Sequence, residues 1–414
     1  MRLGMHLHAL CGAWLDHPFW KTKFVLRDAA DLAKLQQSGI HECWIDVSKG
    51  LDIACAAEDV GDIATGVRLA ALDLDTATDL ARAAAVATEK PVAFAEEVRR
   101  AAALCNQARA AVTSLFAEAR MGRVVYSEQC AELVNEIAGS VWRNPTALLS
   151  LARLKTHDDY SYMHSVAVSA LMAALAKQLN LDEAQVRSAA KAGLLHDMGK
   201  AVMPLQILNK PGKLTEDEFA VIRTHPRHGH ALLLAGESAD HAVLDVCLHH
   251  HEKMDGSGYP DQLSGDQISL FARMGAVCDV YDAITSNRPY KQGWDPAESI
   301  AKMAGWSKGH FDPLIFKAFV TSLGIYPVGS LVRLKSGLLA VVTQQKEQAL
   351  TSPEVKVFFS TQQGVHVTPR LLDLSNMNCT DQIVSRESND TWQFTHLDAL
   401  WAGEDVLRKM GRKA

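Results

Sequence analysis

The chain has 414 residues, of which 48% are hydrophobic and 22% charged, and its formal net charge is −6. These values are typical of a globular protein with two or three domains. They exclude a globally basic surface, so no DNA partner is expected, and an anionic ligand would need local positive charge.

The cysteines and the N-terminal residues bear on the compartment. The eight cysteines form no CxxC pair, which favours reduced thiols in the cytosol over a disulfide framework. The first 20 residues make a poor signal peptide, because they hold one basic residue and an apolar stretch broken by two histidines. A transmembrane helix needs a run of about 18 apolar residues, which the sequence lacks. We therefore expect a cytoplasmic protein without a membrane span.

Residues 1–123 are expected to form a small α+β N-terminal domain followed by a linker and a helix. Strand-like patterns at 23–26 and 41–47 lie on either side of a helical pattern at 28–37. Residues 51–90 are rich in alanine and aspartate and have weak periodicity, which indicates a linker.

Long amphipathic helices dominate from residue 92 onward, because apolar residues recur there at three- and four-residue spacing. Such helices are predicted at 95–119, 127–142, 159–179 and 182–196. Thr215-Glu-Asp-Glu218 is a capping box and predicts a further helix that runs toward His228. The fold class is therefore mainly α, with one helical domain predicted over residues 124–325.

The pattern changes again after Ile325. Three β-rich segments are divided by breaks that contain glycine, serine or proline, and they predict strands at 331–334, 338–344 and 355–360. We expect a small β-containing C-terminal module over residues 326–414.

Histidines are concentrated in the helical domain, where ten of the 17 lie between His157 and His251. His196 and Asp197 together supply an imidazole nitrogen and a carboxylate able to bridge two cations. Lys200 would face the same side if the helical turn continues, and it could there meet a phosphate. Taken alone, this pair is also compatible with an ordinary polar helix end.

Further ionisable residues lie in apolar segments, where they are costly unless paired or bound to a metal. They are His164, His225, His250, His251 and Asp279. Together with His196 and Asp197 they indicate one shared metal centre. Imidazole and carboxylate ligands without thiolate disfavour a structural zinc site and suit iron or manganese. Two ions about 3.5–4 Å apart are the usual arrangement for hydrolysis.

Three motifs in this order resemble the HD-GYP branch of the HD-domain phosphohydrolases. They are HDMGK at 196–200, His250–Pro260 with its DGSGYP loop, and DVYDAITSNRPYK at 279–291. The resemblance covers residues 124–325 and implies an HD-type α-helical bundle that hydrolyses cyclic di-GMP to pGpG, and often on to GMP, in bacterial signalling. The N-terminal segment resembles an uncharacterised domain commonly placed ahead of HD-GYP, and its position suggests regulation or formation of a homodimer.

The resemblance also implies roles for individual residues. Asp197 would bridge the metals and Lys200 would contact the scissile phosphate, so both are predicted to be catalytic. Arg288 and Lys291 would bind substrate phosphate or guanine. The Gly256–Pro260 loop, with Gly258 and Tyr259, would shape the substrate side and could contact partners such as diguanylate cyclase domains. The implied metal ligands are His164, His196, Asp197, His225, His250, His251 and Asp279.

One position departs from the family pattern. Some members hold a third metal through a glutamate four residues before the first histidine, and here that position is Tyr160. Tyrosine, with a pKa of about 10, is a poor replacement at neutral pH. We therefore expect two divalent ions, iron or manganese, with zinc, nickel and magnesium as alternatives. Asp158 and Asp159 lie on other faces of the predicted helix.

Several alternatives stay open at this point. The substrate could be another cyclic dinucleotide, such as cyclic GMP-AMP, because metals read the phosphate and not the base. The chain could also be a catalytically weak sensor or scaffold. His249 is interpreted as a helix neighbour of the ligand pair, Glu252 as a hydrogen-bond partner, and Asp282 as support for the ligands rather than a ligand itself.

Overall fold

The structure is a computed structural model, and the chain divides into two compact units, Met1–Ala71 and Leu72–Ala414. The residues that it describes are 6–11, 24–25, 42–45, 90–123, 130–154, 160–210, 212–236, 240–286, 293–346 and 349–411.

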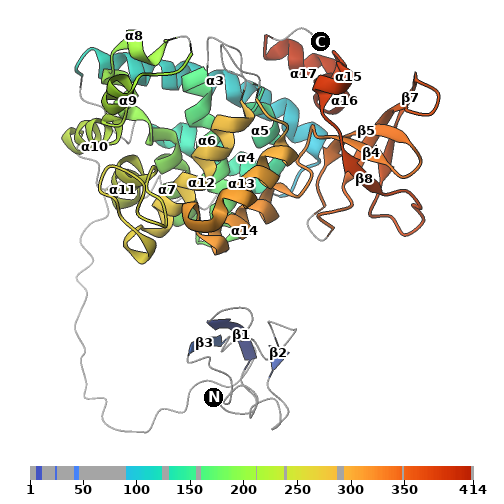
Figure 1. The fold of residues 1–414 in the computed structure, drawn as a ribbon, viewed down its shortest axis with the longest axis horizontal. Helices are drawn as coiled ribbons and strands as arrows, with labels where there is room; N and C mark the ends of the chain where they lie inside the picture. The colour runs from blue at the N-terminus through green and yellow to red at the C-terminus, as the bar shows by residue number, and fades with distance from the viewer. Residues whose placement is uncertain are drawn as a thin grey trace. The chain divides into compact units, whose positions relative to one another are not determined.

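The first unit contains a three-stranded antiparallel sheet of order β2-β1-β3 (Figure 1). Its strands are β1 (His6–Cys11), β2 (Phe24–Val25) and β3 (Glu42–Ile45). β2 and β3 lie inside two predicted strands, whereas β1 was not predicted individually. The predicted helix at 28–37, and the predicted linker apart from Lys90, lie outside the described residues.

The second unit is mostly helical. Its helices up to the C-terminal sheet are α3 (Phe94–Arg120), α4 (Ala131–Arg143), α5 (Pro145–Ala152), α6 (Tyr160–Gln178), α7 (Glu183–Leu195), the 3₁₀ helix η3 (Met198–Val202), α8 (Leu205–Leu208), α9 (Glu216–Ile222), α10 (His225–Ala235), α11 (His241–His249), η4 (Gly265–Gln267), α12 (Leu270–Thr285), α13 (Pro296–His310) and α14 (Pro313–Leu323). The fold is thus mainly α, as predicted. None of the described helices is long and apolar enough to cross a membrane.

Helix α6 is the centre of this bundle. Its residues 163–176 are all buried, as expected for a helix that is apolar around most of its circumference. It packs against α7, α12, α3, α5, α4 and α14 (Figure 1). A residue in the middle of α6 can therefore meet residues from several neighbouring helices at once.

The helix predicted from Thr215 toward His228 is divided in two, which corrects that prediction. The capping box is present, because the Thr215 hydroxyl accepts from the Glu218 amide and the Glu218 carboxylate accepts from the Thr215 amide. However, α9 ends at Ile222 and α10 begins at His225. Pro226 explains the break, since proline lacks an N–H and its ring clashes with the carbonyl four residues earlier. In the first turn of α10 the same proline is well tolerated.

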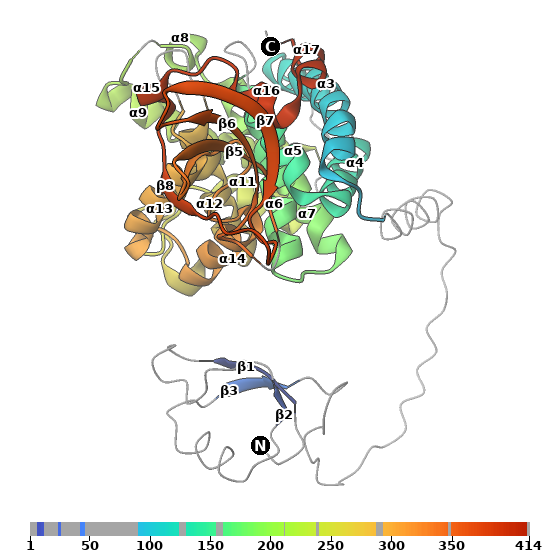
Figure 2. The same ribbon diagram turned by 90° about the vertical axis from the view of Figure 1, so that its right-hand side faces the viewer.

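The C-terminal part forms a five-stranded antiparallel sheet of order β7-β6-β5-β4-β8, which Figure 2 views in front of the helices. β4 (Leu331–Leu334), β5 (Leu338–Gln344) and β6 (Glu354–Ser360) confirm the three predicted strands. The elements that the sequence did not predict are β7 (Val365–Asp373), β8 (Ile383–Arg386), α15 (Asn389–Trp392), α16 (Leu397–Ala402) and α17 (Glu404–Lys409). β7 is largely exposed, so its sequence lacks the apolar alternation of a half-buried strand.

Helix α3 and the C-terminal sheet share one core with the helices between them. Leu339 and Phe358 of the sheet belong to the same buried cluster as residues of α3 and α6, and α17 packs against α3. Near the N-terminus of α3, the buried Glu97 carboxylate accepts hydrogen bonds from Arg143 at 2.7 and 2.9 Å and from Ser140 at 2.8 Å. The predicted boundaries at 123/124 and 325/326 stay predictions.

Replacing Glu97 by alanine is expected to lower the free energy of unfolding by about 3–5 kcal/mol, because the Arg143 side chain, only 12% exposed, would lose this buried carboxylate. Denaturant unfolding followed by circular dichroism measures the change. Glu96→Ala is the matched control. Its partner Arg100 is exposed, so the loss should be below about 1 kcal/mol. Equal losses in the two variants would contradict this role for Glu97.

Candidate metal centre

The seven predicted ligands come from five helices or helix ends that meet at one place. His164 lies inside α6, and Asp279 lies inside α12. His196 is the C-cap of α7 and Asp197 follows it. His225 begins α10, and His250 and His251 follow α11. All are buried except His251, whose side chain is 22% exposed.

Asp197 lies between two groups of histidines and turns one carboxylate oxygen toward each. The first group is His164 and His196, and the second is His225 and His250. Its Oδ2 is 3.4 Å from Nε2 of both His164 and His196. Its Oδ1 is 3.2 Å from Nε2 of His225 and 3.8 Å from Nε2 of His250. A carboxylate with this placement has the geometry expected of a ligand that bridges two ions.

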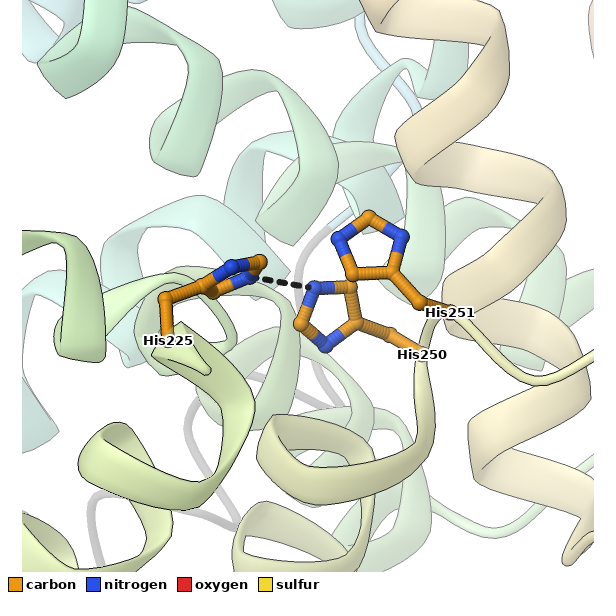
Figure 3. Close-up of side chains that lie close together, drawn as sticks. All are labelled: His225, His250 and His251. Atoms are coloured by element: carbon orange, nitrogen blue, oxygen red, sulfur yellow. Dashed lines mark hydrogen bonds between the residues drawn. The ribbon is translucent and has the colours of Figure 1, made fainter. Parts of the chain in front are cut away.

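The remaining predicted ligands complete the two groups. Asp279 Oδ1 is 3.0 Å from His164 Nε2 and 3.8 Å from His196 Nε2. Asp279 Oδ2 is 3.7 Å from Nδ1 of His251. Figure 3 shows His225, His250 and His251 converging, with 3.4 Å between the Nε2 atoms of His225 and His250. Asp279 therefore touches the first group through one oxygen and the second through the other.

Four of the rings are oriented by hydrogen bonds at Nδ1. The carbonyl oxygens of Gly193, Ile222 and Val246 lie 2.8–2.9 Å from Nδ1 of His196, His225 and His250, respectively. A carbonyl can only accept, so Nδ1 carries the proton and the Nε2 lone pair faces the centre. Nδ1 of His164 meets the Asp282 carboxylate at 2.6 Å. Such partners at the second ring nitrogen are typical of metal-binding histidines.

The residues present fit a pair of divalent ions. His196 Nε2 and Asp197 Oδ1 are buried without a hydrogen-bond partner, although buried polar atoms are normally satisfied. Ligand atoms in three overlapping groups lie within 4.8 Å of one another, and these groups are His225, His250 and His251, then His164, His196 and Asp279, then His196, Asp197 and His250. The donors are imidazole nitrogens and carboxylate oxygens, a mixture that suits iron or manganese.

The two groups differ in their affinity for protons. Burial lowers the pKa of His250 well below its usual value, and the neighbouring histidines lower it further. Burial likewise lowers the pKa of His251 to about 3. Burial alone would also lower the pKa of His164, but the carboxylates of Asp197, Asp279 and Asp282 raise it to about 10. The His250 and His251 rings are therefore neutral at physiological pH, whereas His164 holds a proton when no metal competes.

Two glycines allow the close contact between Asp197 and α10. A Cβ on Gly199 would lie 1.8 Å from the His225 carbonyl oxygen, and one on Gly229 of α10 would lie 2.8 Å from the Gly199 backbone nitrogen. Gly199 is therefore required by the packing of η3 on α10. No pattern in the sequence indicates this contact.

Lys200 and the glycine loop lie around the centre. The Lys200 amine is 2.5 Å from Asp197 Oδ2, so it faces the same place as the ligands. The Tyr259 ring stacks on His251, with 4.6 Å between ring centroids. A Cβ on Gly258 would lie 2.5 Å from the Glu252 Cα, which means that the loop packs directly on the backbone after His251.

The structure separates His249 from its two neighbours in the HHH run. Its Nδ1 meets Asp245 at 2.7 Å and its Nε2 meets Asp261 at 3.1 Å, so both nitrogens are engaged outside the ligand groups. Glu252 accepts a hydrogen bond from the Asp261 amide, as expected of a supporting residue.

Some predicted residues cannot be placed. Arg288, Lys291, Asp158 and Asp159 lie outside the described residues, and Tyr160 is described only as the first residue of α6. One residue that the sequence did not single out lies close to the site. Arg223 precedes His225 by two positions and lies over the Tyr259 ring at 4.8 Å. Its proximity to a predicted ligand was the only available signal.

Asp282→Ala is expected to weaken metal binding by about 10–100-fold, because the His164 ring would lose its orienting partner. Competition with a chelator measures this affinity independently of turnover. Asp282→Asn keeps an oxygen that can accept from Nδ1 and should fall in between. Asp266→Ala, at a fully exposed side chain, is the control. Equal affinity in the wild type and Asp282→Ala would rule out this role.

Metal affinity is expected to increase with pH around neutrality. His164 must release a proton to coordinate through a neutral ring, and the pKa near 10 in the metal-free protein means that the proton is present at pH 7. The affinity should therefore rise by up to about tenfold per pH unit for each proton released. Calorimetry in buffers of different ionisation enthalpy counts these protons. Binding without proton release would contradict the protonated state of His164.

Comparison with known proteins agrees with the family that the sequence motifs resemble. A family profile described as an HD domain matches residues 144–315, and one described as a domain of unknown function (DUF3391) matches residues 1–130. The chain is 52% identical over 404 residues to the cyclic di-GMP phosphodiesterase PA4108 of Pseudomonas aeruginosa, which covers 97% of this chain and 94% of the relative.

Two other relatives match over about a third of the chain. The cyclic di-GMP phosphodiesterase response regulator RpfG of Xanthomonas campestris is 47% identical over 140 residues, covering 34% of this chain and 37% of the relative. The 3′3′-cGAMP-specific phosphodiesterase 2 of Vibrio cholerae is 36% identical over 140 residues, covering 34% of this chain and 27% of the relative. The full-length match to PA4108, together with the HD profile and the HD-GYP motifs, shows that this chain belongs to the HD-GYP family of HD-domain phosphodiesterases.

Proposed function

We propose that this protein hydrolyses cyclic di-GMP to the linear dinucleotide pGpG, with two divalent metal ions held by the seven residues of the candidate centre. The observation that carries the proposal is the placement of Asp197, whose two oxygens face two separate histidine groups. The substrate is proposed from the name of the relative that matches nearly the whole chain. Iron or manganese is the proposed metal, because the donors combine imidazole and carboxylate.

The chain's own residues would prepare the site for this reaction. His164, His196, Asp279 and Asp197 Oδ2 would hold one ion, and His225, His250, His251 and Asp197 Oδ1 the other. When bound, the ions would supply Lewis-acid stabilisation and a water of lowered pKa. The Nδ1 hydrogen bonds keep the Nε2 lone pairs directed inward, so the histidines need no reorientation.

Lys200 would act on the charge that develops during hydrolysis. Its amine lies against Asp197, next to the place where a phosphate would have to bind, and it is 27% exposed. A cation at that position would stabilise the additional negative charge on the non-bridging phosphate oxygens as a nucleophile attacks phosphorus and the 3′ oxygen leaves.

Partners and compartment are also proposals. The Gly256–Pro260 loop presents Ser257 at the surface and could bind diguanylate cyclase domains, and the N-terminal unit could mediate a homodimer. Cys105, Cys247, Cys278 and Cys379 are free thiols, which supports a cytoplasmic location.

The His196→Ala/Asp197→Ala double variant tests the proposal. We expect two metal ions per chain in the wild type and fewer in the variant. We also expect cyclic di-GMP hydrolysis to fall by more than about 100-fold, since changes to residues behind the ligands already cost about 10–100-fold. Metal analysis after anaerobic purification and product chromatography provide the measurements.

His228→Ala is the matched control, because this exposed histidine lies on α10 close to the site. It should keep the wild-type metal content and rate. Unchanged hydrolysis in the double variant would contradict the site assignment. A fully metallated wild type that binds cyclic di-GMP without turnover would favour a sensor, and one that cleaves only cyclic GMP-AMP would overturn the proposed substrate.

A further inference from the structure

A column of stacked groups leads outward from the candidate metal centre. Tyr259 stacks on the predicted ligand His251 with 4.6 Å between centroids and an interplanar angle of 27°. The Arg223 guanidinium lies over two aromatic rings. It is 4.8 Å from the centroid of the Tyr259 ring and 6.0 Å from the centroid of the Phe219 ring. Phe219 itself is 44% exposed, so the column ends at the surface.

The hydrogen-bonding edge of Arg223 is free among the residues that the structure describes. The side chain is exposed and has no ion pair or side-chain hydrogen bond with any of them. The nearby Arg227 differs, because it pairs with Asp261. Arg273 also differs, since it donates to Ile268 and Asp312. The aromatic column therefore holds a planar cation in place while leaving its five donors available to a ligand.

The position of Arg223 sets it apart from Lys200. Lys200 contacts Asp197, where the scissile phosphate would bind, whereas Arg223 lies over the Tyr259 ring, and that ring stacks on His251. A nucleotide base is separated from its phosphate by the ribose, so a group one ring farther out is placed to meet a base. The free hydrogen-bonding edge of Arg223 suits a planar partner with two adjacent acceptors.

We infer that Arg223 is a specificity-determining residue that binds a guanine base of the substrate, stacked on Tyr259 and paired in bidentate fashion with guanine O6 and N7. This inference rests on the proposed function and deepens it. Adenine presents an amino donor in place of O6, so the guanidinium donors would have one acceptor fewer and would face a second donor.

The experiment compares wild type, Arg223→Ala and Arg223→Lys on three ligands. These are cyclic di-GMP, the base-specific competitor cyclic di-AMP, and bis(p-nitrophenyl) phosphate, a phosphodiester without a base. Arg223→Ala should lower kcat/KM for cyclic di-GMP by roughly 5–150-fold, mainly through KM, because one bidentate contact to guanine is lost. Hydrolysis of bis(p-nitrophenyl) phosphate, its inhibition by cyclic di-AMP and the metal content should stay at wild-type levels.

Lysine at this position separates base recognition from simple charge. Arg223→Lys keeps the positive charge but loses the planar fork, so it should resemble Arg223→Ala. Recovery of wild-type KM in Arg223→Lys would place a phosphate at this residue and overturn the inference. An equal loss on bis(p-nitrophenyl) phosphate would also overturn it, because the defect would then lie in the chemistry rather than in base binding.

A control variant and the activity of the wild type separate a failure of this inference from a failure of the proposed function. Arg100→Ala removes an exposed arginine of α3 that is paired with Glu96, and it should leave all three measurements unchanged. A wild type that does not cleave cyclic di-GMP would refute the proposed function itself. A wild type that cleaves it at a rate that Arg223→Ala matches would refute only the role of Arg223.

Discussion

The burial of Asp197 is the constraint on which the rest of the site depends. A carboxylate that is 2% exposed has lost nearly all of its hydration, and such a loss costs several kcal/mol unless other charges or donors replace the water. Burial alone would raise the pKa of Asp197, yet Lys200, His196 and His164 hold it well below its usual value. The carboxylate therefore stays ionised inside the bundle, and its surroundings must supply positive charge.

Helix ends are the parts of the fold that satisfy this requirement. A helix interior commits its backbone groups to itself, whereas the last turns leave carbonyl oxygens free to accept from a ring. His196, at the end of α7, and His250, at the end of α11, each have a nearby carbonyl of the same helix against Nδ1. Only His164 lies inside a helix, and it meets a carboxylate of α12 instead. The local chain thus orients each ring before any ion is bound.

Features that show within a few positions of the sequence could be predicted, whereas contacts between separate helices could not. His164 and Asp279 were predictable because an ionisable residue in an apolar helix stands out within a few positions. The division between α9 and α10 follows from Pro226, but the capping box at Thr215 was the stronger local signal and it masked the break. The contact of Gly199 with α10 could not be predicted, because it joins two helices whose separation is set only by packing.

The same limit explains why Arg223 had no signal of its own. Its partner Tyr259 comes from a loop far along the chain, and that loop reaches the site only because Gly258 lets it lie against the backbone at Glu252. Tyr259 of the GYP loop thus contacts a residue outside that motif, Arg223. The GYP loop sets where an arginine could stack, while the residue at position 223, two residues before His225, determines whether one does. Chemistry at the metal centre and recognition of the base therefore depend on different residues, and the second can change without disturbing the first.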